Sequence, residues 1–229
     1  MSKVNCGGGL ALFWKQDFDL HVESSSLNHI DVLINRGKES ARHFTGLFGA
    51  LETQMRINSW NLLRNLHSYF SIPWLCADNF NELTKTNEKL GGQLRPYGQM
   101  KIFQVALDEC GLRDLGFVGN KFTWFKNYPN GGIVWERLDR AVATNEWVDL
   151  FPATKVHTLE VGSSDHKPIL ILPSGFVVKQ NRPWRFEQMW LKDDGYHDTV
   201  AATWGINSEG SPMFKVVEKI NTCQKKLRG

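Results

Sequence analysis

Three short segments of the chain gather carboxylate, amide and imidazole side chains, which can move protons and hold metal ions or anions. They are residues 73–82 (PWLCADNFNE), 136–141 (ERLDRA) and 163–169 (SSDHKPI). A carboxylate or an imidazole can handle protons at a reacting water, and carboxylate oxygens suit hard cations such as Mg²⁺. Each segment alone is a weak signal, since a lone Ser-Asp-His triplet most often forms a surface turn. Any chemistry therefore depends on a fold that joins the three.

In this order, the segments resemble the Gly-Asp-Phe-Asn, Arg-Leu-Asp-Arg and Ser-Asp-His-x-Pro motifs of the endonuclease/exonuclease/phosphatase superfamily. Further landmarks between and after them fit as well: residues 88–92 (EKLGG), 112–116 (LRDLG), 122–124 (FTW) and 182–187 (RPWRFE). Together they resemble the endonuclease domain of a plant LINE-type (non-LTR) retrotransposon, truncated at its N-terminus, and the connector that leads to its reverse transcriptase. The resemblance covers nearly the whole chain.

The resemblance implies hydrolysis of a DNA phosphodiester, assisted by Mg²⁺ or Mn²⁺, with a reverse transcriptase domain following in the full-length element. It implies that His166 contacts the scissile phosphate, that Asp165 lies near the metal, and that Asn81 donates its amide to the phosphate. Asp139 would orient the His166 ring, because a carboxylate fixes the tautomer and stabilises the charged form. Two plainer interpretations remain: His166 as a surface-turn histidine, and Asp139 in a salt bridge to a neighbouring arginine.

Several positions depart from the family pattern. Asn79 stands where the resemblance places the catalytic Asp, and an amide cannot accept a proton from water. Asp78 replaces a glycine, whose usual role is to let the backbone turn or approach closely. Since adjacent strand residues face opposite ways, Asp78 could replace the lost base only if the strand end twists or slips. Phe48 stands where the family tends to carry a tyrosine, so a hydroxyl is lost there.

The resemblance also implies that the chain starts after the first strands, which would carry an Asn and a metal-binding Glu. Glu23, Glu39 and Glu52 are present, but none lies in a matching context. Affinity for Mg²⁺ should therefore be weakened, because this strongly hydrated ion needs anionic oxygen ligands. Missing strands should also leave sheet edges and apolar faces uncovered.

Alternating strand and helix patterns must position the three segments. We predict strands where apolar residues alternate or run together, and helices where they recur at helical spacing. The expected strands are 10–14, 18–22, 30–34, 43–48, 74–77, 122–125, 134–143, 156–161 and 169–172, with a turn at 130–132. The expected helices are 58–70, 99–110 and 146–151, with a loop at 88–98. This order indicates an α/β sandwich of two mixed β-sheets flanked by helices, DNase I-like by the resemblance, with its first strands missing.

After Pro173 the sequence changes from alternating strand and helix patterns to a polar stretch followed by helical patterns. We expect residues 1–173 to form the truncated endonuclease/exonuclease/phosphatase domain. Residues 174–229 would be a polar linker and a helical connector, interrupted at 205–212 and amphipathic from 213 to 227.

Amino-acid composition, net charge and cysteine spacing narrow the class of protein further. Of 229 residues, 41% are hydrophobic and 22% charged, which is typical of a globular protein. The net charge of +3 leans weakly toward polyanions, without a basic cluster. The four cysteines lack metal-site spacing, which does not favour zinc, and two lie in apolar stretches typical of a reducing compartment. No apolar run approaches the ~18 residues of a membrane helix, and the N-terminus does not resemble a secretory signal. We therefore expect a nuclear or cytoplasmic protein.

Three interpretations of function remain. The first is a metal-dependent DNA endonuclease, impaired in this copy. The second is a catalytically inactive remnant with at most weak nucleic-acid binding. The third is another branch of the superfamily, such as a lipid phosphatase or an RNA deadenylase. The tail at 182–190 resembles the retrotransposon connector and argues against the third. Asn79 and the missing start favour the second over the first.

Overall fold

The computed structural model describes residues 10–129, 131–160, 164–175, 194–205 and 212–227. The chain divides into two units, residues 1–176 and 177–229. The boundary predicted near residue 174 lies just before residues 176–193, which are outside the described residues. Most of the predicted linker lies within that stretch.

A six-stranded sheet forms the centre of the first unit, in the order β1-β2-β3-β4-β9-β6. Only the β3–β4 pair is parallel, and the other described pairs in the sheet are antiparallel. The strands are β1 (Leu20–Ser25), β2 (His29–Ile34), β3 (Arg42–Leu47), β4 (Trp74–Asn79), β6 (Arg113–Asp114) and β9 (Asp139–Ala143). The strands predicted near 18–22, 30–34, 43–48 and 74–77 are confirmed, and the first two pair as a hairpin.

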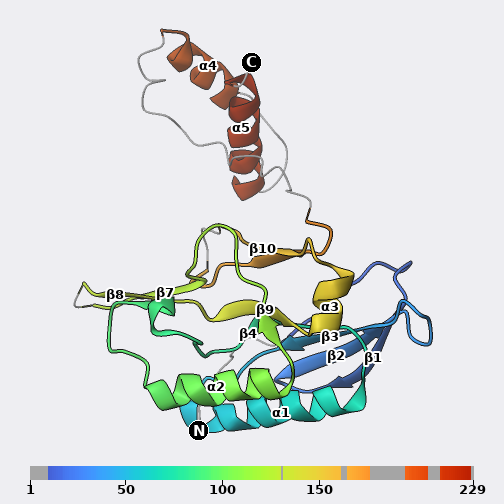
Figure 1. Cartoon of the computed structure of the whole chain (residues 1–229). Coiled ribbons are helices and arrows are strands. Elements are labelled where there is room, and N and C mark those ends of the chain that lie inside the picture. Colours follow the sequence, from blue (N-terminus) through green and yellow to red (C-terminus); the bar gives the residue numbers. More distant parts are fainter. Residues whose placement is uncertain (1–9, 130, 161–163, 176–193, 206–211, 228–229) are drawn as a thin grey trace, which may run out of the picture. The chain divides into compact units, whose positions relative to one another are not determined.

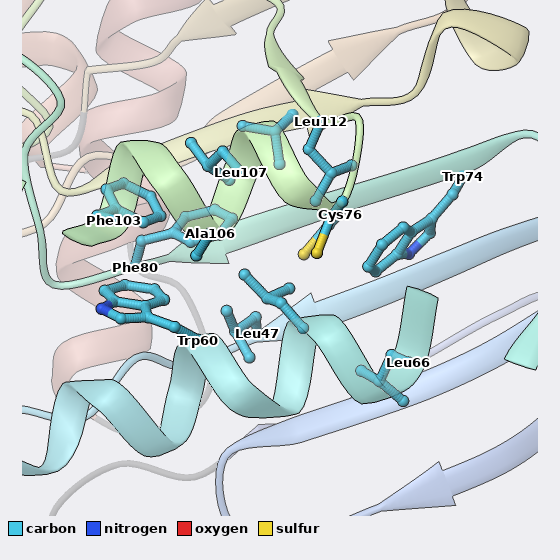
Figure 2. Packing of buried hydrophobic residues seen from close by; sticks show 13 residues of the cluster. Leu47, Trp60, Leu66, Trp74, Cys76, Phe80, Phe103, Ala106, Leu107 and Leu112 are labelled. Carbon is cyan, nitrogen blue, oxygen red and sulfur yellow. The ribbon is translucent and has the colours of Figure 1, made fainter. Parts of the chain in front are cut away.

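Two helices cover one face of this sheet (Figure 1). They are α1 (Arg56–Tyr69), preceded by the short η1 (Thr53–Met55), and α2 (Tyr97–Glu109). Figure 2 shows Trp60 of α1 and Phe103 of α2 among the buried residues of one cluster, to which Trp74 and Cys76 of β4 also belong. The Trp60 and Phe103 rings stack with centroids 4.4 Å apart. Burial of this apolar surface is the main force that holds the helices on the sheet.

The opposite face of the sheet buries a second apolar cluster. Leu75 and Ala77 of β4 pack there with Trp147 of α3 (Asn145–Leu150) and Val156 of β10 (Lys155–Thr158). Strand β10 pairs antiparallel with β11 (Ile169–Leu172) in a separate two-stranded sheet. The expected α/β fold of mixed sheets flanked by helices is confirmed.

A third, three-stranded sheet lies in the order β5-β8-β7. Its strands are β5 (Lys89–Leu90), after the short η2 (Thr86–Glu88), β7 (Trp124–Asn127) and β8 (Ile133–Glu136). The predicted loop at 88–98 is therefore partly wrong, because it contains β5 and the first two residues of α2. The single strand predicted at 134–143 is also wrong. Arg137 and Leu138 interrupt it, since their backbone groups bond to Glu88 and Phe80 outside the strand ladders.

The strand predicted at residues 10–14 is wrong for the described part of the chain. No strand is assigned there, and the Phe13 side chain is 91% exposed. An apolar run becomes a buried strand only when a neighbouring strand and a covering layer accept it. None of the described strands pairs with this run.

The second unit contains α4 (Asp194–Trp204) and α5 (Pro212–Lys226), which agrees with the helical character expected there. The parts of the predicted helical connector at residues 184–193 and 206–211 lie outside the described residues. Among the described residues of the whole chain, no helix has the length and apolar character needed to cross a membrane.

Candidate active site

The three predicted segments meet where β4 ends and β9 begins. Asn79 of β4 lies opposite Asp139 of β9 in the antiparallel ladder. The third segment joins them by pairing with the start of β7: Asp165 accepts a hydrogen bond from Phe125 N, and Lys167 N donates to the Thr123 carbonyl. Trp124 and His166 thus form an isolated antiparallel bridge at the start of β7. Ser163 lies outside the described residues.

His166 and Asp139 form a direct pair in this site. His166 Nδ1 lies 2.9 Å from Asp139 Oδ2, and the side chains are 34% and 11% exposed. When Nδ1 donates to the carboxylate, Nε2 is the ring nitrogen that carries the lone pair in the neutral form. Burial, the largest single influence, lowers the pKa of His166. The hydrogen bond and charge of Asp139, with the charges of Asp165 and Asp78, outweigh it and raise that pKa above its usual value.

Thr123 fixes the main chain that carries Asp139. Its Oγ1 accepts the backbone N–H groups of Leu138 at 3.0 Å and of Asp139 at 2.9 Å. Thr123 is 1% exposed, so water does not replace it as an acceptor. The same residue also receives Lys167 N at its carbonyl. Thr123, directly before β7, therefore holds the backbone of Asp139 and that of Lys167, the neighbour of His166.

The arginines beside Asp139 are engaged elsewhere. Arg137 and Arg140 form ion pairs with Glu88 and Asp114, whereas the ion pair recorded for Asp139 is with His166. Burial raises the pKa of Glu88, but the charge of Arg140, its hydrogen bond and further contacts lower it to about 2. The motif arginines thus anchor the strand that presents Asp139, a role that sequence reasoning missed. The signal was available, because Glu88 was itself a landmark residue.

Asn79 and Asn81 use their side chains to hold the loop after β4. Asn79 Oδ1 accepts the N–H of Asn81 at 2.8 Å, and Asn81 Nδ2 donates to the Gly49 carbonyl at 2.6 Å. Both asparagines are about 5% exposed or less. A Cβ on Gly49 would lie 2.1 Å from the Phe80 carbonyl oxygen, so the two loops touch through bare backbone. A phosphate contact by Asn81 remains a prediction.

Asp78 occupies an unusual position. Its φ is +123°, a conformation that L side chains rarely adopt. Its side chain lines a cavity of ≈ 470 Å³ together with Asp139 and His166. The remainder of that cavity is mainly apolar and includes Ile30, Phe44 and Ile169.

Asp165 is the motif residue expected near a metal. It is exposed, and its Oδ2 accepts the indole N–H of Trp124 at 3.0 Å. Among the residues that the structure describes, no group of three or more His, Cys, Asp or Glu side chains is arranged to hold a metal ion. The described donors therefore do not fit a complete Mg²⁺ or Mn²⁺ site by themselves.

Comparison with known proteins supports the fold. No family model matches the sequence, and no curated protein matches it. Among solved structures, the endonuclease domain of TRAS1, a telomere-specific non-LTR retrotransposon, is 15% identical, with a TM-score of 0.52 and 69% of each chain covered. The match to beta toxin from Staphylococcus aureus is 15% identical, has a TM-score of 0.43 and covers 63% of this chain and 56% of that one.

A further match is an endonuclease/exonuclease/phosphatase family protein from Leptotrichia buccalis C-1013-b, at 16% identity and a TM-score of 0.40. It covers 63% of this chain and 52% of that one. The likeness to the TRAS1 domain shows that this chain has a DNase I-like fold.

Proposed function

We propose that the first unit is a phosphodiesterase of the endonuclease/exonuclease/phosphatase type and that it acts on nucleic acid. The observation that carries this proposal is the 2.9 Å contact between His166 Nδ1 and Asp139 Oδ2. The two residues lie 27 positions apart in different motifs. A DNase I-like fold that joins them is the arrangement that the motif resemblance requires.

The chemistry assigned to His166 is stabilisation of the phosphoryl group. Because the pKa of His166 is raised, a larger fraction of the molecules carries a protonated His166 ring near neutral pH. The Nε2–H of the charged ring donates a hydrogen bond to an anionic phosphate oxygen. This hydrogen bond strengthens in the transition state, because negative charge then develops on the phosphate oxygens. Asp139 holds the ring orientation and stabilises its positive charge.

A divalent cation such as Mg²⁺ or Mn²⁺ would neutralise charge on the phosphodiester when bound. Asp165 is the motif residue that would hold it. One exposed carboxylate binds a strongly hydrated ion weakly, so we expect activity to need a high concentration of Mg²⁺ or Mn²⁺.

The finer assignment is a DNA endonuclease of a plant LINE-type retrotransposon. The motif order and the 182–187 tail support it, and the TRAS1 likeness is consistent with it. In this assignment, residues 1–173 are the nuclease domain and 174–229 a linker and connector. A reverse transcriptase domain would follow, and DNA as substrate favours a nuclear site of action for a protein made in the cytoplasm.

A second candidate is a remnant that binds nucleic acid weakly and does not cleave it. One observation favours it: the position of the family's catalytic Asp holds Asn79, whose Oδ1 is engaged with the backbone of Asn81. An amide in that position cannot take the proton of an attacking water.

The test is nicking of supercoiled plasmid DNA by the 229-residue chain in Mg²⁺ or Mn²⁺, compared with the His166→Ala variant. Loss of an acid–base or charge-stabilising group reduces the rate by roughly 10²–10⁴-fold. His21→Ala is the matched control, because His21 lies on β1 and its side chain is 52% exposed. We expect nicking by the natural chain and by the control, and loss of nicking in His166→Ala. Equal nicking by His166→Ala would refute the assignment, and salt-sensitive binding without nicking would favour the remnant.

A further inference from the structure

The direction of side chains along β4 follows a strict alternation up to Ala77. Cys76 pairs with Val142 in the ladder, and both pack on the face that α1 and α2 cover. Ala77 pairs with Ala141, and both pack on the opposite face with α3 and β10. A regular strand would return the next residue, Asp78, to the helix-covered face.

The ladder partner of Asp78 follows this rule. Asp78 pairs with Arg140, and the Arg140 guanidinium lies over the Phe103 ring of α2, 5.6 Å from its centroid. A carboxylate in the regular position would therefore be directed to the Arg140 side of the sheet. Asp78 instead lines the cavity on the other side, next to Ala77.

The backbone explains the change of direction. The φ of +123° at Asp78 turns the strand end, so that two consecutive residues, Ala77 and Asp78, face the same cavity. The side chain then caps its own turn, since Asp78 Oδ1 accepts the N–H of Asn79 at 2.9 Å. Strained conformations of this kind persist where the surrounding structure determines them, and they gather at functional sites.

We propose that Asp78 is a catalytic residue of this site and that its carboxylate accepts the proton of the attacking water. The inference rests on the proposed phosphodiesterase function. Three facts carry it: Asp78 lines the same cavity as Asp139 and His166, the amide of Asn79 cannot accept a proton, and Asn79 Oδ1 already accepts the N–H of Asn81.

The step balances without a further reactant. One O–H bond of the water breaks and its proton passes to the Asp78 carboxylate, while the water oxygen forms a bond to phosphorus. The phosphorus–oxygen bond to the leaving sugar breaks, and that oxygen takes up a proton from solvent water. Protonated Asp78 returns its proton to solvent before the next turnover.

The surroundings of Asp78 suit this role. Burial is the main cause that raises the pKa of Asp78, and the charge of Asp139 adds to it, while the Asn79 hydrogen bond and His166 act in the opposite sense. A carboxylate with a raised pKa is a stronger base, which improves proton transfer from water.

The test compares nicking of supercoiled plasmid by the natural chain, Asp78→Asn and Asp78→Gly. Asp78→Asn keeps the shape and removes the base, and Asp78→Gly accepts the positive φ without strain. Asn35→Gly is the matched control, because Asn35 also has a positive φ of 55° and lies after β2 in an exposed turn. We expect both Asp78 variants to lose nicking by roughly 100-fold or more, with an unfolding midpoint for Asp78→Gly at or above that of the natural chain. Asn35→Gly should nick normally.

The double variant Asp78→Gly/Asn79→Asp separates this proposal from the proposed function. If the natural chain nicks and both Asp78 variants still nick, Asp78 is not the base and the phosphodiesterase assignment stands. If only the double variant nicks, Asp78 is not the base and the natural chain is the inactive remnant, although its fold still supports phosphodiester cleavage. If neither the natural chain nor the double variant nicks, both the Asp78 proposal and the phosphodiesterase assignment are overturned.

Discussion

Replacing Glu88 by glutamine should destabilise the first unit by about 3 kcal/mol at pH 7. Glu88 is 4% exposed and binds Arg140, which is fully buried, and Arg137. Its pKa falls from 4.5 to about 2, and each pKa unit corresponds to about 1.4 kcal/mol, which gives roughly 3 kcal/mol for the charged form. Breaking a buried ion pair from one side costs about 3–5 kcal/mol in general, so two independent arguments agree.

The pH dependence of the effect follows from the sign of the shift. The folded-state pKa of Glu88 is depressed, so its stabilising contribution is present above the unfolded-state value near 4.5. The contribution is lost as the pH falls from about 4.5 to about 2. The natural chain and Glu88→Gln should therefore differ most at neutral pH and converge in acid.

Urea unfolding followed by tryptophan fluorescence, at several pH values from 7 to about 3, measures this difference. Glu109→Gln is the control, because Glu109 pairs with Arg64 at the surface and its side chain is 52% exposed. Exposed pairs contribute about 0–1 kcal/mol. A Glu88→Gln variant as stable as the Glu109→Gln control, or a difference that grows in acid, would refute the reasoning.

Two further substitutions test the contacts that position the site. Gly49→Ala should cost about 3 kcal/mol or more and reduce nicking, because the new Cβ would meet the Phe80 carbonyl at 2.1 Å. Gly98→Ala, with open space around it, should leave urea unfolding unchanged or shift it slightly upward. Thr123→Val should destabilise by roughly 2 kcal/mol, because it leaves buried N–H groups, including that of Asp139, without their acceptor. Nicking should also fall in Thr123→Val, and unchanged stability and activity would show that Thr123 does not hold β9.

The helices and the central strands were predictable because their patterns are local. The apolar spacing in residues 58–70 predicts α1 (Arg56–Tyr69) to within two residues. The apolar run at 74–77 predicts β4 (Trp74–Asn79), whose residues are buried on both faces. Trp60, Leu63 and Leu66 of α1 pack in one cluster with Trp74 and Cys76 of β4, whereas Leu75 and Ala77 pack on the opposite face of the sheet.

The predicted strands that are wrong lie where residues far away in the sequence determine whether a strand forms. Residues 10–14 have the composition of a buried strand, but no described strand pairs with them. Residues 134–143 have one continuous strand pattern, yet Arg137 leaves the ladder because its side chain and N–H bind Glu88, 49 positions earlier. No local pattern encodes contacts of that range.

The candidate site shows the same division. The motif resemblance placed His166 beside Asp139, and the structure brings these side chains to 2.9 Å. The direction of Asp78 was not predictable, since alternation along a strand assigns it to the opposite face and only the backbone angle reverses this. The positive φ also explains why a glycine suits this position in the family pattern.

Asp78 and Asn79 are neighbours at the end of β4, so a substitution at one position changes the electrostatic surroundings of the other. Asn79→Asp alone would add a carboxylate beside Asp78 and opposite Asp139 in the ladder. Neighbouring like charges disfavour ionisation of one another, so the single change would add a carboxylate while raising the free-energy cost of ionising it. Removing the Asp78 carboxylate at the same time relieves both that repulsion and the strained φ. We therefore expect Asp78→Gly/Asn79→Asp to be more stable than Asn79→Asp alone, which urea unfolding of the two variants would measure.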